Sequence, residues 1–267
     1  MTRCLLAAVL IGLAAAHAAT AGDVLDRVHR DGVVRCTAEE RPAVAEYRPD
    51  GGIGGIAVDV CRAVAIAVLG RDGRVEFSVA GSAEDADVAF VSADGAAGHA
   101  LLATGPTIFV DRLSVLVPMN SHVRAIDDLG GETVCLMIGS PEQSALEAAV
   151  VRLRIDIVRL AFEEDDEMRD AYAVGRCDAM AGTETELAEL RGPMGINRLV
   201  SRIVPVPLAL VPVVAATGKR DRDWSAIAFW VARTIVGTEA GTPPPAGVRP
   251  GWREDFGASF SGSKTMP

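Results

Sequence analysis

The chain has few aromatic residues, few histidines and a deficit of basic residues. Only 4% of its 267 residues are aromatic, so a ligand pocket lined with several rings is not expected. The four histidines are scattered and no C-x-x-C motif occurs, which argues against a metal site, and we expect no cofactor. The formal net charge of -10 argues against nucleic acid as a partner.

The first 21 residues have the pattern of an export signal. A basic residue, Arg3, precedes an apolar run from Leu5 to Ala16, and Ala19-Thr20-Ala21 fits the rule for a cleavage site. Ala16-His17-Ala18 is a second site that fits, and an uncleaved anchor is the alternative. The run is about a dozen residues, too short to span a bilayer, and no later segment is long and apolar enough to do so. We therefore predict a signal peptide at 1–21 and an exported mature chain.

Four cysteines remain in the mature chain, after Cys4 has left with the signal. They fall in two sequential groups, Cys36 with Cys61 and Cys135 with Cys177. An exported chain meets an oxidising compartment, where disulfides form and persist. Disulfides are therefore the favoured interpretation, and a metal site is the alternative.

Strand and helix patterns alternate along the chain. Apolar runs and apolar–polar alternation predict strands at 33–36, 75–79, 88–91, 113–118, 132–138, 155–162, 177–181 and 208–215. Helical spacing predicts helices at 23–30, 57–69, from 140, 163–174, 183–190 and 224–236. The loop 39–55 is rich in turn residues, and the tail from Thr242 is predicted to be poorly ordered. This order predicts an α/β fold with mostly parallel sheets flanked by helices.

Two predicted helices carry strong start signals. Ser140 is a good N-cap, Pro141 suits the first helical position and Gln143 completes a capping box. Thr183 and Glu186 form a second capping box. The helix from Ser140 follows a strand directly, so its free N–H groups should lie at the sheet edge where open α/β folds bind ligands.

Five segments, in order, carry a resemblance to a known family. The stretch from Gly55 to Ala65, "G-I-A-V-D-V-C-R-A-V-A", resembles the "G-F-D-V-D-F-C-R-A-V-A" segment of periplasmic solute-binding proteins for amino acids. More narrowly, it resembles the general L-amino-acid-binding proteins of polar amino-acid ABC transporters, in solute-binding protein family 3. The other matching segments are 25–36, 134–139, 171–178 and 207–230, so the resemblance covers roughly residues 23–240.

The resemblance implies a two-lobed, Venus-flytrap fold of the type II periplasmic-binding-protein kind. Lobe one would hold 22–112 and 207–267, and lobe two would hold 113–206. Crossing strands near 113–117 and 205–210 would form the hinge. The cysteines would pair as Cys36–Cys61 within lobe one and Cys135–Cys177 within lobe two, which leaves hinge closure free.

The family's charged ligand anchors are missing from the matching positions. Family members hold the ligand's α-carboxylate with an arginine, but no arginine occurs between Val75 and Val110. Thr183 stands where the family has an aspartate for the α-amino group, and Val44 stands where an aromatic residue is usual. Each hydrogen bond to a charged group contributes about 1.5–3 kcal/mol, so losing two would lower affinity by roughly 10²–10⁴ unless other residues replaced them.

Replacement contacts are available on both lobes, each with a plainer interpretation. Asp94 follows a buried strand at the expected ligand edge and would meet a cationic group, or it is a solvated turn residue. Ser92 matches a family position that touches ligand, or it makes a local turn hydrogen bond. Gly139 and Ser140, with the N–H groups that follow, would hold a carboxylate, although capping alone explains Ser140.

Three further residues complete the candidate ligand set. Thr183 would hydrogen-bond the ligand, or it is only an N-cap. Glu184 would replace the lost carboxylate one position later. Arg41 would supply the missing positive charge from the first loop. No catalytic residue is predicted, since no nucleophile, base and orienting group stand out.

The favoured function is that of a periplasmic substrate-binding protein that captures a small polar solute and delivers it to an ABC permease in the inner membrane. In this function a monomer closes its hinge over one ligand and catalyses no reaction. The first alternative is a repurposed module of the same fold, an accessory to a periplasmic enzyme or sensor that binds no amino acid. The second is an enzyme, because cyclic-acid dehydratases share this fold; it would need a positioned acid or base in the cleft.

Overall fold

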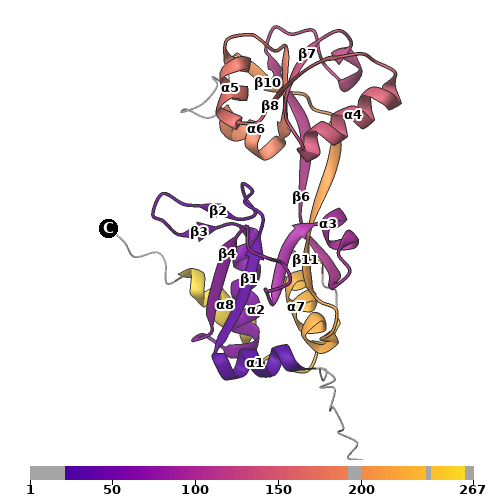
Figure 1. The fold of residues 1–267 in the computed structure, drawn as a ribbon. Coiled ribbons are helices and arrows are strands. Elements are labelled where there is room, and N and C mark those ends of the chain that lie inside the picture. The colour runs from indigo at the N-terminus through magenta and orange to yellow at the C-terminus, as the bar shows by residue number, and fades with distance from the viewer. Residues whose placement is uncertain (1–21, 192–199, 239–241, 262–267) are drawn as a thin grey trace, which may run out of the picture.

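Two lobes are joined by a pair of long strands in the computed structural model (Figure 1). It describes residues 22–191, 200–238 and 242–261, so the predicted signal peptide at 1–21 lies outside the described residues. The joining strands are β6 (Leu102–Pro118) and β11 (Ala209–Gly218), which pair antiparallel. Within these ranges no helix has the length and apolar character needed to cross a bilayer. The predicted two-lobed α/β fold is confirmed.

Lobe one contains the first and last described segments of the chain, and lobe two is built from its middle. The elements of lobe one are α1 (Asp23–Asp31), β1 (Val33–Ala38), β2 (Glu46–Tyr47), β3 (Ile53–Gly54), α2 (Ile56–Leu69), β4 (Arg74–Val79), β5 (Val88–Ser92), α3 (Ala93–Gly98), α7 (Arg222–Ile235) and α8 (Trp252–Ser261). Those of lobe two are the 3-10 turn η1 (Ile126–Leu129), β7 (Thr133–Met137), α4 (Pro141–Leu153), β8 (Val158–Phe162), α5 (Asp165–Ala173), β9 (Ala179–Thr183), α6 (Glu184–Leu190) and β10 (Ser201–Ile203).

One sheet runs through both lobes, in the order β4-β1-β5-β11-β6-β9-β7-β8, with β10 paired to β6. Within lobe one β1 pairs parallel with β4 and β5, and within lobe two β7 pairs parallel with β8 and β9. In the described part of this sheet, every antiparallel pair includes β6 or β11. Each lobe is therefore a parallel α/β unit, and the antiparallel strands connect the two.

Helix α2 forms the centre of the lobe-one core. Its sequence is rich in Ala and Val, and ten of its residues are buried, including Val60, Cys61 and Val64. They are buried because α2 packs against β1, α7 and α8. The cluster extends to Phe90 on β5 and Trp224 on α7. In lobe two the apolar residues form two clusters, one on each side of the sheet.

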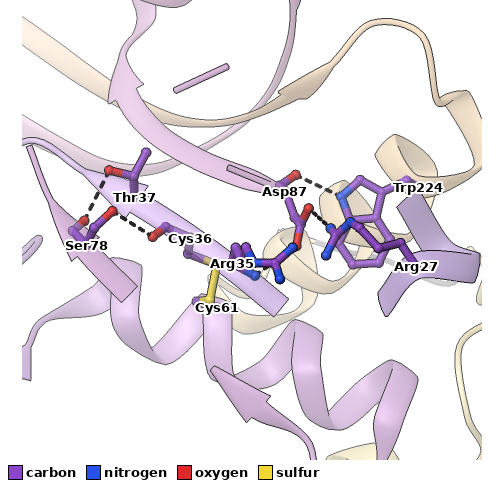
Figure 2. Close-up of a disulfide and its surroundings, with 8 residues drawn as sticks. All are labelled: Arg27, Arg35, Cys36, Thr37, Cys61, Ser78, Asp87 and Trp224. Atoms are coloured by element: carbon purple, nitrogen blue, oxygen red, sulfur yellow. Dashed lines mark hydrogen bonds and ion pairs between the residues drawn. A yellow bond between two sulfur atoms is a disulfide. The ribbon is translucent and has the colours of Figure 1, made fainter. Parts of the chain in front are cut away.

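A disulfide and a buried carboxylate tie β1 to its neighbours (Figure 2). Cys36 on β1 is bonded to Cys61 on α2, with 6.3 Å between their Cα atoms. Asp87 is 7% exposed and accepts from the backbone N–H of Arg35 at 2.8 Å and from the Arg27 guanidinium. The backbone carbonyl of Asp87 also accepts from the Trp224 indole at 2.8 Å, which joins α7 to the loop before β5. The second disulfide, Cys135–Cys177, lies within lobe two, with 5.7 Å between Cα atoms.

The C-terminal tail corrects the prediction of poor order from Thr242. Helix α8 packs against α2, and its Trp252 is 3% exposed and meets Trp230 edge-on at 6.0 Å between ring centroids. The Arg253 guanidinium lies 5.1 Å from the Trp230 ring, and the backbone N–H of Arg249 donates to the Ala67 carbonyl at 2.7 Å. The Pro- and Gly-rich composition suggested a loose end, but one buried tryptophan is enough to anchor the segment.

Other boundaries also differ from the prediction. The strand predicted at 113–118 begins at Leu102, because residues 102–112 pair with β11 along lobe one. The strand predicted at 177–181 lies at 179–183, since Asp178 is held at the strand's entrance by bonds to the Thr133 backbone. The loop 39–55 contains the small hairpin β2–β3.

Candidate functional site

The predicted ligand residues follow the carboxyl ends of four parallel strands. Arg41 follows β1 and Ser92 ends β5 in lobe one, while Ser140 follows β7 and Thr183 ends β9 in lobe two. These are the strand ends at which open α/β sheets bind ligands. In Figure 1, hairpin β2–β3 of lobe one and α6 of lobe two lie on the sides of the lobes that are turned toward each other. The structure therefore places these four predicted residues at strand ends of both lobes.

Arg41 is brought to the junction of the lobes by a carboxylate on β6. Its Nη1 lies 3.2 Å from Oδ2 of Asp111, which is only 1% exposed. The other carboxylate oxygen of Asp111 accepts from the Thr185 hydroxyl at 3.2 Å and from the backbone N–H of Arg112 at 2.8 Å. Arg41 also lies 3.7 Å from Glu39. The guanidinium that was predicted to hold a ligand's carboxylate is thus already paired within the protein.

Glu184 is likewise engaged by a neighbour on β6. Its carboxylate lies 3.3 Å from Nε of Arg112, and Nη2 of Arg112 donates to the Pro205 carbonyl at 3.1 Å. Arg112 precedes the point at which β6 enters lobe two, where Leu113 pairs with Thr183. The predicted amine-binding role of Glu184 would require this ion pair to be shared or broken.

Thr183 caps α6 through a complete capping box. Its hydroxyl accepts from the Glu186 backbone N–H at 3.1 Å, and the Glu186 carboxylate accepts from the Thr183 backbone N–H at 3.2 Å. The Thr183 side chain is 2% exposed, which favours its capping role over ligand contact. Desolvation raises the pKa of Glu186, with repulsion from Glu142 adding to it, while the Thr183 hydrogen bonds and the charge of Arg41 oppose the rise.

The start of α4 differs from the predicted capping box. Ser140 caps the helix as predicted, its hydroxyl accepting from the Gln143 backbone N–H at 3.1 Å. The Gln143 side chain, however, accepts from the Gly139 backbone N–H at 2.8 Å instead of that of Ser140. Gly139 adopts the left-handed conformation (φ 74°) that this turn requires. Most of the N–H groups at this turn are therefore satisfied internally, and Glu142 places a negative charge beside them.

Ser92 and Asp94 lie on the short helix α3, which the sequence did not predict. The Ser92 hydroxyl caps it by accepting from the Gly95 backbone N–H at 3.2 Å, as the plainer interpretation expected. Asp94 is exposed in its first turn. The structure thus brings Arg41, Thr183 and Glu184 together at residues 111–113 of β6. It places Ser92 and Asp94 at the start of α3, which packs against β6 and β11.

A cavity of about 240 Å³ opens in lobe two between α4, α5 and α6. Its lining includes the thioethers of Met137, Met168 and Met180 and the acids Glu142 and Glu186. Ser140 and the ion pair of Arg169 with Asp165 also line this cavity. In the described ranges no group of three His, Cys, Asp or Glu side chains that could hold a metal ion is found.

Acidic side chains of the two lobes also influence one another. Desolvation raises the pKa of Glu189 on α6, and the charge of Glu46 on β2 raises it further, while Arg169 opposes the rise. Glu46 belongs to lobe one and Glu189 to lobe two. One acid of each lobe therefore lies close enough for the two charges to interact.

The sequence interpretation missed Asp111, Arg112, Thr185 and Glu186 as functional candidates. One signal was present, because Asp111 and Arg112 are adjacent charged residues in a mostly apolar segment between Ile108 and Val117. A charged pair inside such a strand must find partners, and here the partners come from both lobes.

Comparisons with known proteins point to one group. No family model matches the chain. The chain is 27% identical over 247 residues to the putative amino-acid ABC transporter-binding protein YhdW of Escherichia coli K12, covering 88% of this chain and 72% of that protein. The chain is a relative of amino-acid ABC transporter-binding proteins. It is also 26% identical over 249 residues to the general L-amino acid-binding periplasmic protein AapJ of Rhizobium johnstonii, covering 87% and 71%. The predicted resemblance is confirmed.

Solved structures agree on the fold. A periplasmic binding protein of an ABC transporter from Brucella ovis, with glutathione bound, superposes with a TM-score of 0.68 at 18% identity, covering 88% of this chain and 86% of that one. Holo ArgBP from T. maritima gives a TM-score of 0.57 at 17% identity, covering 79% and 93%. At these identities the likeness establishes the two-lobed architecture.

Proposed function

We propose that the protein is the periplasmic substrate-binding protein of an ABC transporter and captures a small polar solute, an amino acid or a related compound. The observation that carries this proposal is the relationship to YhdW over 88% of the chain, which includes both lobes and both hinge strands. The relatives are named as binding proteins, which supports a role in binding and not in catalysis.

The mechanism is closure of the lobes about β6 and β11. We place the lobe boundaries between residues 112 and 113 and between 206 and 207, so that lobe one comprises 22–112 with 207–267 and lobe two comprises 113–206. Each disulfide joins residues of one lobe, and the two hinge strands are the covalent route between the lobes. A hinge of this kind lets both lobes rotate while their cores stay packed.

Export and delivery complete the role. The signal at 1–21 would send the chain to the periplasm, where the two disulfides form. The partner is then an inner-membrane ABC permease that receives the solute from the monomeric, closed protein.

The charges at the lobe junction favour a solute that carries a cationic group. Arg41 and Arg112 are paired with Asp111 and Glu184, so a ligand carboxylate would have to compete for them. Glu186 carries a raised pKa beside Glu142, and a ligand cation would relieve that repulsion. In this arrangement Arg41 and Glu184 line the junction, and Thr183 orients α6. Ser140 borders the lobe-two cavity, with Gly139 beside it in the chain. Ser92 and Asp94 would meet the ligand from lobe one.

A thermal-shift screen of the mature chain, Gly22–Pro267, tests this function. Panels of basic, neutral and acidic amino acids, small organic acids and polyamines are compared at 1 mM. A ligand present at a thousand times its Kd stabilises the folded state by about 4 kcal/mol, a shift of several degrees. A shift with basic amino acids or polyamines supports the proposal, whereas no shift with any compound contradicts it.

The second function is a repurposed module that serves a periplasmic enzyme or sensor. The specific observation in its favour is that the arginine and glutamate available as ligand anchors are both engaged internally. It predicts no response in the same screen and co-purification with a periplasmic protein instead of a permease.

A further inference from the structure

Asp111 occupies an unusual position, because its buried carboxylate is bonded by side chains from both lobes. The carboxylate is 1% exposed, and each of its oxygens has a partner. Oδ2 faces the Arg41 guanidinium at 3.2 Å, and Oδ1 accepts from the Thr185 hydroxyl at 3.2 Å. Arg41 belongs to the loop after β1 in lobe one, and Thr185 belongs to the first turn of α6 in lobe two.

Both partners are held firmly in their own lobes. Two backbone hydrogen bonds between Arg41 and Ala45, each 2.9 Å long, close the lobe-one loop. The capping box of Thr183 and Glu186 fixes the turn that carries Thr185. The backbone of each partner is therefore fixed in its own lobe, so only rotation of its own side chain could follow Asp111 when the lobes rotate.

Rotation about the hinge moves the backbone of at least one of these partners relative to Asp111. Asp111 pairs with Val211 on β11, just before β6 enters lobe two at Leu113. If Asp111 moves with lobe two, its bond to Arg41 spans the lobes; if it moves with lobe one, its bond to Thr185 does. Bonds of this kind are lost when the heavy atoms separate beyond about 3.6 Å, so the full set exists at one lobe angle.

We propose that Asp111 is a positioning residue that fixes the angle between the lobes, through its bonds to Arg41 and Thr185. The ion pair of Arg112 and Glu184 lies beside these bonds and holds the same end of α6 to β6. In the function proposed above, this angle determines how the solute enters and how much of the binding free energy is used in closure. The inference deepens that function, but the bonds act on the lobes whether or not a solute is present.

The test measures the distance between the lobes without any ligand. Spin labels on unnatural amino acids at Asp72 in lobe one and Asp166 in lobe two avoid the four cysteines, and both positions are exposed. The variants are Asp111→Asn, Arg41→Gln and Thr185→Val, and the matched control is Thr234→Val. Thr234 makes a comparable hydroxyl bond, 3.0 Å to the Trp230 carbonyl, wholly within lobe one.

We expect Asp111→Asn, and at least one of Arg41→Gln and Thr185→Val, to increase the population of other lobe arrangements about tenfold or more. This is the change in an equilibrium constant that corresponds to a hydrogen bond to a charged group. Thr234→Val should leave the distance distribution unchanged. If Asp111→Asn does not fold, the two partner variants still decide the question, because Thr183 and the capping box remain intact in Thr185→Val.

Wild-type distance distributions in both partner variants would overturn the inference, even if their thermal stability fell. A ligand screen with no response would contradict the proposed function and leave this result unaffected. The two failures are therefore distinguishable.

Discussion

The two lobes share a plan of parallel strands and flanking helices, yet they differ in how their helices are used. In lobe one, α2 is buried along most of its length and is covered by α7 and α8. In lobe two, α4, α5 and α6 are half exposed, and their first turns carry acids such as Glu142, Asp165 and Glu184. The difference indicates that lobe one has its central helix within its core, whereas the lobe-two helices leave charged first turns at the surface.

Removing the aromatic anchor of α8 should have the largest effect and would test whether the lobe-one core depends on its tail. Trp252→Ala should lower the free energy of unfolding by about 3–5 kcal/mol, the range for truncating a buried aromatic side chain. Chemical denaturation followed by circular dichroism measures it. Tyr47→Ala, at a residue 60% exposed, is the control. Equal losses in the two variants would show that α8 is not part of the core.

Removing one disulfide at a time should show whether the lobes are stabilised separately. The bonds close loops with sequence separations of 25 and 42 residues. Loop-closure entropy gives about 3.5 kcal/mol for Cys36–Cys61 and about 4 kcal/mol for Cys135–Cys177. Hydrogen exchange on double Cys→Ala variants should report loss of protection confined to the lobe that lost its bond. Equal loss in both lobes would contradict independent packing.

Neutralising Glu186 should show whether lobe two supplies the charge that selects the solute. Glu186→Gln keeps the capping box, since glutamine also serves at that position, but removes the charge. Affinity for a basic amino acid should fall about tenfold, as for one lost charge-assisted hydrogen bond. Calorimetric titration measures the change, and Glu167→Gln, at an exposed acid of α5, is the control. Unchanged affinity in Glu186→Gln would remove Glu186 from the site.

The smallest effect is expected at Glu189, where the lobes repel each other. Its folded-state pKa is raised above the ordinary value of 4.5, so the folded protein binds this proton more readily than the unfolded chain. Stability is therefore lost as the pH rises through that raised pKa. Glu189→Gln should be more stable than the parent at pH 7, by less than about 1 kcal/mol, and equally stable at pH 3. Melting curves across this range check it; a larger gain at pH 3 would contradict the assigned repulsion.

The sequence predicted the scaffold better than the site, for physical reasons. Apolar periodicity and local capping depend on near neighbours, so α2, α4 and α6 were placed within a few residues. The family resemblance added the two-lobed fold and the cysteine pairs. The contacts of Asp111 with Arg41 and Thr185 join residues 70 and 74 positions apart in the sequence. Patterns between near neighbours in the sequence cannot predict contacts over such separations. The helix α8 was missed because its composition is typical of loops, whereas burial of Trp252 holds it against the core.

Isothermal titration of the ligand-free mature protein tests the central claim most directly, that a solute with a cationic group binds between the lobes. We predict that L-arginine or L-lysine binds with one-to-one stoichiometry and that L-glutamate binds at least about tenfold more weakly, the ratio expected for one charged contact. Absence of heat with L-arginine, L-lysine and polyamines alike, or tighter binding of L-glutamate than of these compounds, would contradict the account.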